Sequence, residues 1–268
     1  MSNPSRTLSI ISSVIVGFGS LLPGQPTDRH NELTPEEVRA GWVLLFDGKT
    51  ARGWSSPSSE QFPNGFWRIE DGFLRGAAVG ARGIDLQSTE KFRNFELQFE
   101  WKIELGGNSG LKYLVGSSQK LVFEGNGLPQ REGTTQPGPN AIFREGTYGM
   151  EYQMVDEAEH PDGKSPLTIS GALYQFAGLE RSHARPAGQL NRSKIVVNGS
   201  RIEHWLNGTR VVAVDTASEE FRSTASKAPG RTRRALDYLS QEGPIAIQSH
   251  TGAVWIRNIK LRRLKPLP

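Results

Sequence analysis

The chain has 268 residues with 30 glycines, 16 prolines and no cysteine, and its formal net charge is +4. The lack of cysteine excludes disulfide bonds, thiolate catalysis and cysteine-ligated zinc. The small charge, with basic residues scattered except at 231–234, argues against nucleic acid as a partner. The length fits one large domain, and many short β-branched and aromatic runs between turn residues predict a fold built mainly of strands.

The first 24 residues have the layout of a secretory signal segment. Arg6 precedes an apolar run at 8–22, and a Pro-Gly break follows. The run is too short to span a bilayer comfortably. A cleaved signal peptide and an uncleaved anchor both fit residues 1–24, since no A-x-A cleavage site is visible. Either one predicts an extracytoplasmic domain, periplasmic or secreted, with no membrane role beyond this segment.

After this segment the sequence predicts one short helix and a long series of strands. A helix is expected at 34–41, with Thr34 as N-cap and Glu37 closing a capping box. Strands are expected at 42–46, 66–76, 95–104, 108–115, 149–155, 170–176, 193–199, 201–208, 210–215, 243–250 and 253–264. Two long loops rich in glycine and proline, 116–146 and 220–242, interrupt the series.

The strand at 95–104 has the most regular alternation in the chain. Its apolar side chains occupy every second position and share one face: Phe95, Leu97, Phe99, Trp101 and Ile103. Because strands are many and long helical periodicity is absent, we predict an all-β fold. Two packed antiparallel sheets in a jelly-roll sandwich account for a chain of this kind.

One later predicted strand has an apolar face and a polar face. In the segment 150–155, Met150, Tyr152 and Met154 share one side, while Glu151 and Gln153 share the other. The apolar side must face the core. The polar side is either a solvated strand face or part of a site.

A second strand repeats this pattern. At 245–250 the alternation places Gln248 and His250 opposite two isoleucines. A sheet face with carboxylate, amide and imidazole groups suits a sugar, whose hydroxyls need both donors and acceptors. Tyr174, Trp205 and Trp255 are candidates for stacking on a sugar ring, although each also fits the core.

A segment rich in aspartate, glutamate and histidine follows the first polar strand. Asp156, His160 and Asp162 are residue types that bind a divalent cation, and a solvated acidic loop is the alternative. No cofactor is required by the sequence beyond this possible cation. His204 has an ordinary Asn-Gly hairpin setting, so it is expected to be a surface strand residue.

Six segments, in this order, resemble the 3-keto-disaccharide hydrolase family, formerly a domain of unknown function. They are GWVLLFDGKTARGW, FELQFEWKIELGGNSGLKYLV, YGMEYQMVDEAEHPDG, GALYQF, IEHWLNG and GPIAIQSHTGAVWIRNIKL. The resemblance covers residues 41–264 and implies one concanavalin A-like jelly-roll domain, which we place at 41–265. It also implies a bacterial, extracytoplasmic enzyme whose carbohydrate substrates are glycosides or disaccharides oxidised at carbon 3 of a glucose-type ring.

The resemblance further implies which positions form the site. The matching residues are Asn108, Ser109, Gly110, Glu151, Gln153, Asp156, His160, Asp162, Gln248, His250 and 257–259. Two positions depart from the family pattern, because Leu114 stands where many relatives have arginine and Ser249 where aspartate is common. The resemblance therefore implies no substrate contacts at these two positions of this chain.

A ketone at carbon 3 acidifies the hydrogen on carbon 2, so the glycosidic bond can break by elimination, followed by addition of water. This route needs a base, an acid for the leaving oxygen and a donor for the enolate oxygen. We expect His250 and Glu151 to be base and acid, with the roles exchangeable. Lys112 or Arg257 would hold the enolate. Substrate binding is expected from Gln153, Asn108, Asp156, His160, Gln248 and Arg257.

Two other functions fit the same residues. A non-catalytic carbohydrate-binding module would share the fold and the polar face. A conventional retaining glycosidase needs two carboxylates about 5 Å apart. The partner of Glu151 at i+2 is Gln153, an amide that cannot act as nucleophile, so the second acid would have to come from Asp156 or elsewhere.

Overall fold

The structure is a computed structural model that describes residues 30–77, 82–123 and 142–266. The predicted signal segment, residues 1–24, lies outside these residues, as does the middle of the first predicted loop. Within the described ranges, no helix is both long enough and apolar enough to cross a membrane.

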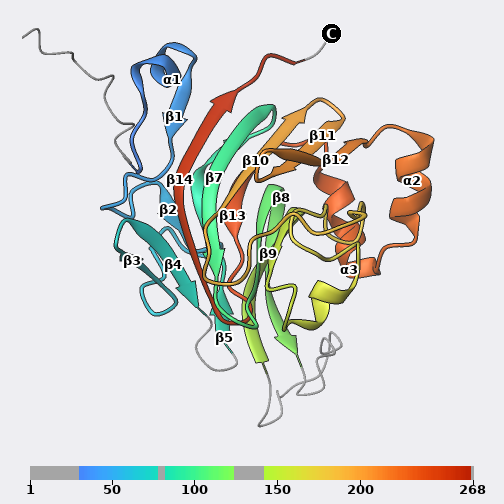
Figure 1. Ribbon diagram of the computed structural model, residues 1–268, viewed down its shortest axis with the longest axis horizontal. Coiled ribbons are helices and arrows are strands. Elements are labelled where there is room, and N and C mark those ends of the chain that lie inside the picture. The colour runs from blue at the N-terminus through green and yellow to red at the C-terminus, as the bar shows by residue number, and fades with distance from the viewer. Residues whose placement is uncertain (1–29, 78–81, 124–141, 267–268) are drawn as a thin grey trace, which may run out of the picture.

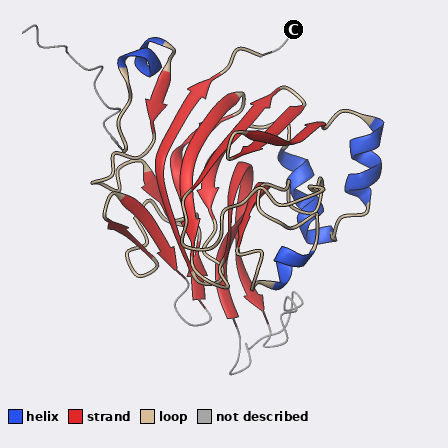
Figure 2. Cartoon of the chain, viewed as in Figure 1, coloured by secondary structure: helices blue, strands red, loops and turns tan. Residues whose placement is uncertain are grey.

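Two β-sheets form a sandwich (Figures 1 and 2). The eight-stranded sheet has the order β12 (Thr209–Asp215), β11 (Arg201–Leu206), β10 (Asn191–Asn198), β7 (Phe95–Ile103), β14 (Ala253–Arg263), β4 (Phe73–Ala77), β3 (Trp67–Glu70), with β1 (Trp42–Leu44) also paired to β14. The six-stranded sheet has the order β2 (Trp54–Ser55), β6 (Leu86–Phe92), β13 (Gly243–Ile247), β8 (Asn108–Phe123), β9 (Ile142–Val155), β5 (Arg82–Ile84). Only the short pairing of β5 with β9 is parallel among the described strand pairs. The predicted all-β jelly-roll sandwich is confirmed.

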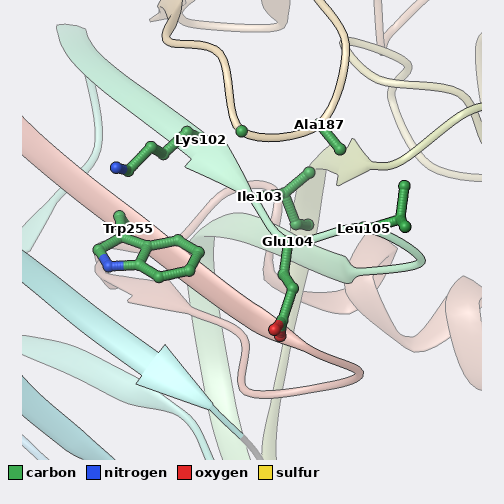
Figure 3. Close-up of a pocket in the computed structure, with 7 residues that line it drawn as sticks. Lys102, Ile103, Glu104, Leu105, Ala187 and Trp255 are labelled. Carbon is green, nitrogen blue, oxygen red and sulfur yellow. The ribbon is translucent and has the colours of Figure 1, made fainter.

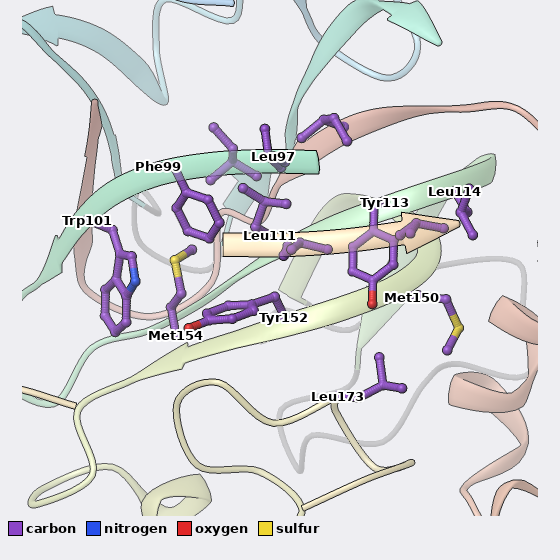
Figure 4. Close-up of a cluster of buried hydrophobic side chains, with 14 of the residues drawn as sticks. Leu97, Phe99, Trp101, Leu111, Tyr113, Leu114, Met150, Tyr152, Met154 and Leu173 are labelled. Carbon is purple, nitrogen blue, oxygen red and sulfur yellow. The ribbon is translucent and has the colours of Figure 1, made fainter. Parts of the chain in front are cut away.

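The core lies between the two sheets, where the alternating apolar residues meet (Figure 4). All five apolar residues of β7 are buried, and Trp101 is 0% exposed. From the facing sheet, Met150, Tyr152 and Met154 of β9 are also 0% exposed. The inward direction predicted for both strands is therefore confirmed. The polar residues between them must point away from the core.

The structure has one helix where it was predicted and further short helices within a predicted loop. Helix α1 (Pro35–Arg39) begins at Thr34, whose side chain forms the predicted capping box with Glu37. The expected loop at 220–242 instead contains α2 (Glu219–Ser226), α3 (Gly230–Arg233) and the 3-10 helix η2 (Arg234–Tyr238), which lie beside the sandwich in Figure 2. The expected loop at 116–146 contains the far ends of β8 and β9.

The expectation that His204 lies on the surface was wrong. His204 is 0% exposed, because Glu203 and Trp205 on either side of it point outward and the alternation of β11 turns it inward. Its Nδ1 donates to the carbonyl oxygen of Gly171 at 2.9 Å, and its Nε2 accepts from the Tyr113 hydroxyl at 2.8 Å. Burial lowers the pKa of His204 to about 4, so the imidazole is neutral.

Candidate active site

The strand register places the predicted polar residues on one face of the six-stranded sheet. β8 lies between β9 and β13. Lys112 pairs with Glu151, and Gly110 pairs with Gln153. On the other side of β8, the backbone N–H of Gln248 donates to the carbonyl of Gly110 at 2.8 Å. Residues that pair across neighbouring strands point to the same side, so these side chains share the outer face of this sheet.

Glu151 lies directly over the glycine of the neighbouring strand. A Cβ atom added at Gly110 would overlap with the carboxylate of Glu151. The missing side chain at Gly110 therefore provides the space in which the carboxylate of Glu151 rests. Gly110, in the first part of β8, thus has a packing role at the site.

Asn108 connects the strand face to the segment after β9. Its Oδ1 accepts from Nε2 of Gln153 at 3.2 Å, and its Nδ2 donates to Oδ2 of Asp162 at 2.9 Å. Asn108 is 4% exposed and Gln153 is 1% exposed. The two amides are therefore held in fixed orientations by their mutual hydrogen bond and by the Asp162 carboxylate.

Two histidines lie side by side above this network. The rings of His160 and His250 have centroids 6.5 Å apart and meet edge to face. Nδ1 of His250 lies 2.9 Å from the hydroxyl of Thr251, whose backbone pairs with Asn108. Both histidines are partly exposed. The structure therefore brings His250 to the same region as His160 and Asn108.

Tyr174 joins the site from a segment that was expected to be a strand at 170–176. This segment forms only isolated bridges, yet it follows the edge of β9: Gly171 donates to the carbonyl of Gln153 at 2.9 Å and Tyr174 to that of Glu151 at 3.0 Å. Burial raises the pKa of the Tyr174 phenol to about 12, and the negative charges of Asp162 and Glu151 add to this effect. Tyr174 is therefore a protonated phenol in the field of two carboxylates.

Lys112 belongs to a buried ion pair on this face. Its Nζ lies 3.1 Å from Oδ2 of Asp85, and both side chains are almost fully buried. Asp85 also accepts from the backbone N–H and hydroxyl of Thr147 and from the backbone N–H of Ser249, each at 3.1 Å. Sequence reasoning missed Asp85, because its partners come from three distant segments. Ser249 and Leu114, the two departures from the family pattern, are both buried.

The predicted cation ligands are not gathered around one point. Both carboxylate oxygens of Asp156 accept backbone N–H groups, from Gly106 at 2.8 Å and from Ala158 at 3.2 Å. Asp156 is 4% exposed and fixes the turn after β9. Across the described residues, no group of three or more histidine, aspartate or glutamate side chains could hold a metal ion. His160 and Asp162 lie at the site. Asp156 lies beside it and stabilises the turn after β9.

Arg257 is not part of this face, contrary to prediction. It lies on β14 in the other sheet, where Nε donates to Oε2 of Glu100 at 2.9 Å and the guanidinium covers the ring of Phe73. Trp205 and Trp255 are also on the outer face of that sheet, with lysine and arginine side chains over their rings. Of the three aromatic candidates, only Tyr174 reaches the site.

The surroundings of Trp255 form a separate hollow at the opposite sheet (Figure 3). The ring lies between Arg75 and Lys102, each 5.1 Å from the ring centroid. The hollow is lined by Trp255 and Lys102 together with Ile103, Glu104, Leu105, Ala187 and Gly188. Since cations occupy positions over this ring, Trp255 is poorly placed to stack on a sugar.

The outer face of the six-stranded sheet gathers several groups that can donate and accept hydrogen bonds. It combines the carboxylates of Glu151 and Asp162, two imidazoles, the Tyr174 phenol and several amides. Such a set offers both donors and acceptors to hydroxyl groups. It also offers groups that can give and take a proton at neutral pH.

Comparisons with known proteins agree with a carbohydrate-related site. The family model of the 3-keto-alpha-glucoside-1,2-lyase-like domain matches residues 41–262. A 3-keto-disaccharide hydrolase of Bacteroides thetaiotaomicron is 31% identical over 242 residues, which are 84% of this chain and 79% of that protein.

Solved structures are similar over most of the chain. The crystal structure of a candidate glycosyl hydrolase of Parabacteroides distasonis is 27% identical with a TM-score of 0.69, covering 88% of this chain and 100% of that one. A second protein of that organism with the same description is 22% identical with a TM-score of 0.52, covering 79% and 99% of the two chains. The second likeness supports the fold alone.

Proposed function

Because the chain belongs to the 3-keto-alpha-glucoside-1,2-lyase-like family, we propose that it cleaves glycosides whose glucose-type ring carries a ketone at carbon 3. The family and the 31% identical hydrolase support an enzyme that acts on carbohydrates. The observation that carries the finer proposal is the shared outer face of Glu151, Lys112 and Gln153, with the amide of Gln153 held by Asn108. His250 reaches the same region through Thr251, whose backbone pairs with Asn108. A carbohydrate substrate is the partner that such a face suits.

The proposed reaction begins at carbon 2. A base takes the proton, the electron pair forms a carbon 2–carbon 3 double bond, and the ketone becomes an enolate. When the ketone re-forms, the double bond moves to carbons 1 and 2 and the glycosidic oxygen leaves with a proton from an acid. Water then adds to carbon 1 and a proton returns to carbon 2, so the net reaction is hydrolysis.

The residues of the face match these steps. His250 is the proposed base, because imidazole titrates near neutral pH, and Glu151 is the proposed acid, with the two roles exchangeable. Lys112 pairs with Glu151 across the strands, and its buried ammonium group is the proposed donor to the developing oxyanion. Asn108, Gln153 and Gln248 are proposed to bind sugar hydroxyls.

The register argues against the ordinary two-carboxylate mechanism. On β9 the residue that shares the face with Glu151 is Gln153, whose amide donates to Asn108. An amide cannot be a nucleophile or a base here. Asp156 cannot readily replace it, because both its oxygens bind backbone N–H groups. Asp162, the other carboxylate of the face, is bound by the amide of Asn108 at 2.9 Å. Elimination needs only one carboxylate and is therefore favoured.

We also propose an extracytoplasmic location, which rests on the composition of residues 1–24. This part of the proposal is independent of the site. Detection of the mature N-terminus after residue 24 in the periplasm or medium would support it, and retention of an intact chain in the cytoplasm would oppose it.

The test of the reaction compares matched glucosides with and without oxidation at carbon 3. The purified protein should release the aglycone from the 3-keto glucoside and leave the ordinary glucoside intact. Release from the ordinary glucoside at a similar rate would indicate a conventional glycosidase. Binding of both sugars without any release would indicate a binding module, and either result would refute the proposal.

A further inference from the structure

Both ring nitrogens of His160 face N–H groups of the protein. Nδ1 accepts from the backbone N–H of Asp162 at 3.1 Å. Nε2 lies 3.5 Å from Nδ2 of Asn108. A neutral imidazole accepts at one nitrogen and carries hydrogen on the other. The position of the proton therefore depends on which of the two neighbours is held more firmly.

The amide of Asn108 cannot turn its oxygen toward His160. Its Nδ2 donates to the carboxylate of Asp162, which only accepts, and its Oδ1 accepts from Gln153. A flip of the amide would place the Asn108 oxygen against the carboxylate oxygen of Asp162. The nitrogen of Asn108 thus stays beside Nε2 of His160.

The backbone contact at Nδ1 is the stronger constraint. It is shorter than the contact at Nε2, and it forms the N-cap of the 3-10 helix η1 (Pro161–Lys164). The lone pair of the neutral ring therefore lies on Nδ1, and the hydrogen lies on Nε2. Because Nδ2 of Asn108 donates and cannot accept, this Nε2–H is available to an acceptor of a molecule bound on the sheet face.

We infer that His160 is a catalytic residue, a neutral imidazole whose Nε2–H donates to the carbon 3 oxygen of the substrate. The inference rests on the proposed function. His160 does not transfer its proton: as His250 takes the proton from carbon 2, the electron pair moves onto the carbon 3 oxygen, and the hydrogen bond from His160 shortens around the growing charge. His160 thereby fills the role that the sequence offered to Arg257, which lies on the other sheet.

The position of the proton can be read without substrate. Long-range proton–nitrogen NMR of the histidine rings, with assignment by single variants, should show His160 as the Nε2–H tautomer at neutral pH. His204 is an internal control, because its Nδ1 faces a carbonyl oxygen and should carry the hydrogen. An Nδ1–H or doubly protonated ring at His160 would overturn the inference.

The donor role is tested with a substrate that can enolise but cannot eliminate. 1,5-Anhydroglucitol oxidised at carbon 3 has no leaving group at carbon 1, and exchange of its carbon 2 hydrogen in heavy water reports proton removal alone. His160→Asn keeps an acceptor that suits an N-cap while removing the Nε2–H. We expect this variant to exchange on the order of 10²-fold more slowly than the wild type, the usual scale for one lost oxyanion donor.

Two controls separate the possible failures. His183→Asn changes a histidine on another loop and should exchange at the wild-type rate. If the wild type exchanges and His160→Asn matches it, the role of His160 is refuted while the proposed reaction stands. If the wild type itself does not exchange the hydrogen, the proposed carbon 2 chemistry is refuted, and the donor role falls with it.

Discussion

The two outer faces of the sandwich are built from similar alternating strands but use their polar side chains differently. On the eight-stranded sheet, carboxylates lie between cations. Glu100 binds Arg192 at 3.0 Å and Arg257 at 2.9 Å, and Glu203 binds Arg210 at 3.2 Å. These carboxylates therefore each have a cation as neighbour. The more exposed pair of Glu203 and Arg210 contributes little to stability, at most about 1 kcal/mol.

The outer face of the six-stranded sheet is organised around amides, imidazoles and a phenol. Gln153 binds Asn108, Asn108 binds Asp162, and the charge of Asp162 helps to raise the pKa of Tyr174. The ammonium group of this face belongs to Lys112, which is buried in its pair with Asp85. The comparison teaches that alternation alone does not mark a site. The difference lies in groups that transfer protons and are held by hydrogen bonds from several segments.

The largest effect is expected in the core, which both faces depend on. Trp101→Ala removes a fully buried ring and leaves Ser193 without the indole donor. We expect a loss of about 3–5 kcal/mol in unfolding free energy. The matched change Trp255→Ala, on the outer face, should cost much less. Urea unfolding of both variants measures the difference, and equal losses would show that the faces are assigned wrongly.

A pH effect on stability is expected from His204. Its pKa is about 4 in the folded chain against an ordinary 6.5, so the unfolded chain binds the extra proton first as pH falls. The unfolding free energy should therefore decrease between pH 6.5 and pH 4, by about 3 kcal/mol from this group. His204→Gln should lack this part of the slope. Parallel slopes for the two proteins would contradict the neutral, buried imidazole.

Matched carboxylates on the two faces sharpen the comparison directly. Glu151→Gln and His250→Ala should each lower turnover of a 3-keto glucoside by on the order of 10²-fold or more, the scale for a lost acid or base. Glu96→Gln changes a carboxylate of the other face, where it binds Arg262, and should leave turnover nearly unchanged. Near-normal rates in both site variants would show that this face is an ordinary solvated surface with no catalytic role.

A smaller effect is expected from the glycine beneath Glu151. Gly110→Ala would push the carboxylate of Glu151 aside without disturbing the core. We expect turnover to fall by about tenfold, since small misplacements of catalytic groups are costly, and the melting temperature to change little. Gly65→Ala, where an added Cβ meets nothing within 4 Å, is the matched control. An unchanged rate in Gly110→Ala would show that the position of Glu151 is not critical.

The inward and outward directions of the strands were predictable from the sequence. The alternation that buries Trp101 and Tyr152 is visible in the residues themselves, because side chains in a strand change sides at every position. The same rule turns His204 inward, against the surface position that its hairpin setting predicts. The Phe221 and Ala225 pair of α2, buried one turn apart, is too short a signal to reveal a helix beforehand.

The sheet to which a strand belongs was harder to predict. Arg257 and Trp255 fit a site by residue type, yet β14 pairs with β7 and carries them to the opposite side of the sandwich. Asp85 and Tyr174 reach the site through pairings between distant segments, which no local pattern reveals. Local periodicity fixes the face of a strand, whereas strand order depends on packing across the whole chain.

The most direct test of the central claim follows the hydrogen of carbon 2 during cleavage. In heavy water, the sugar released from a 3-keto glucoside should carry deuterium at carbon 2, because elimination removes that hydrogen and the solvent returns one. Released 3-keto glucose incubated with Glu151→Gln controls for spontaneous exchange. Release of a sugar that retains its original carbon 2 hydrogen would show direct displacement at carbon 1 and contradict the account.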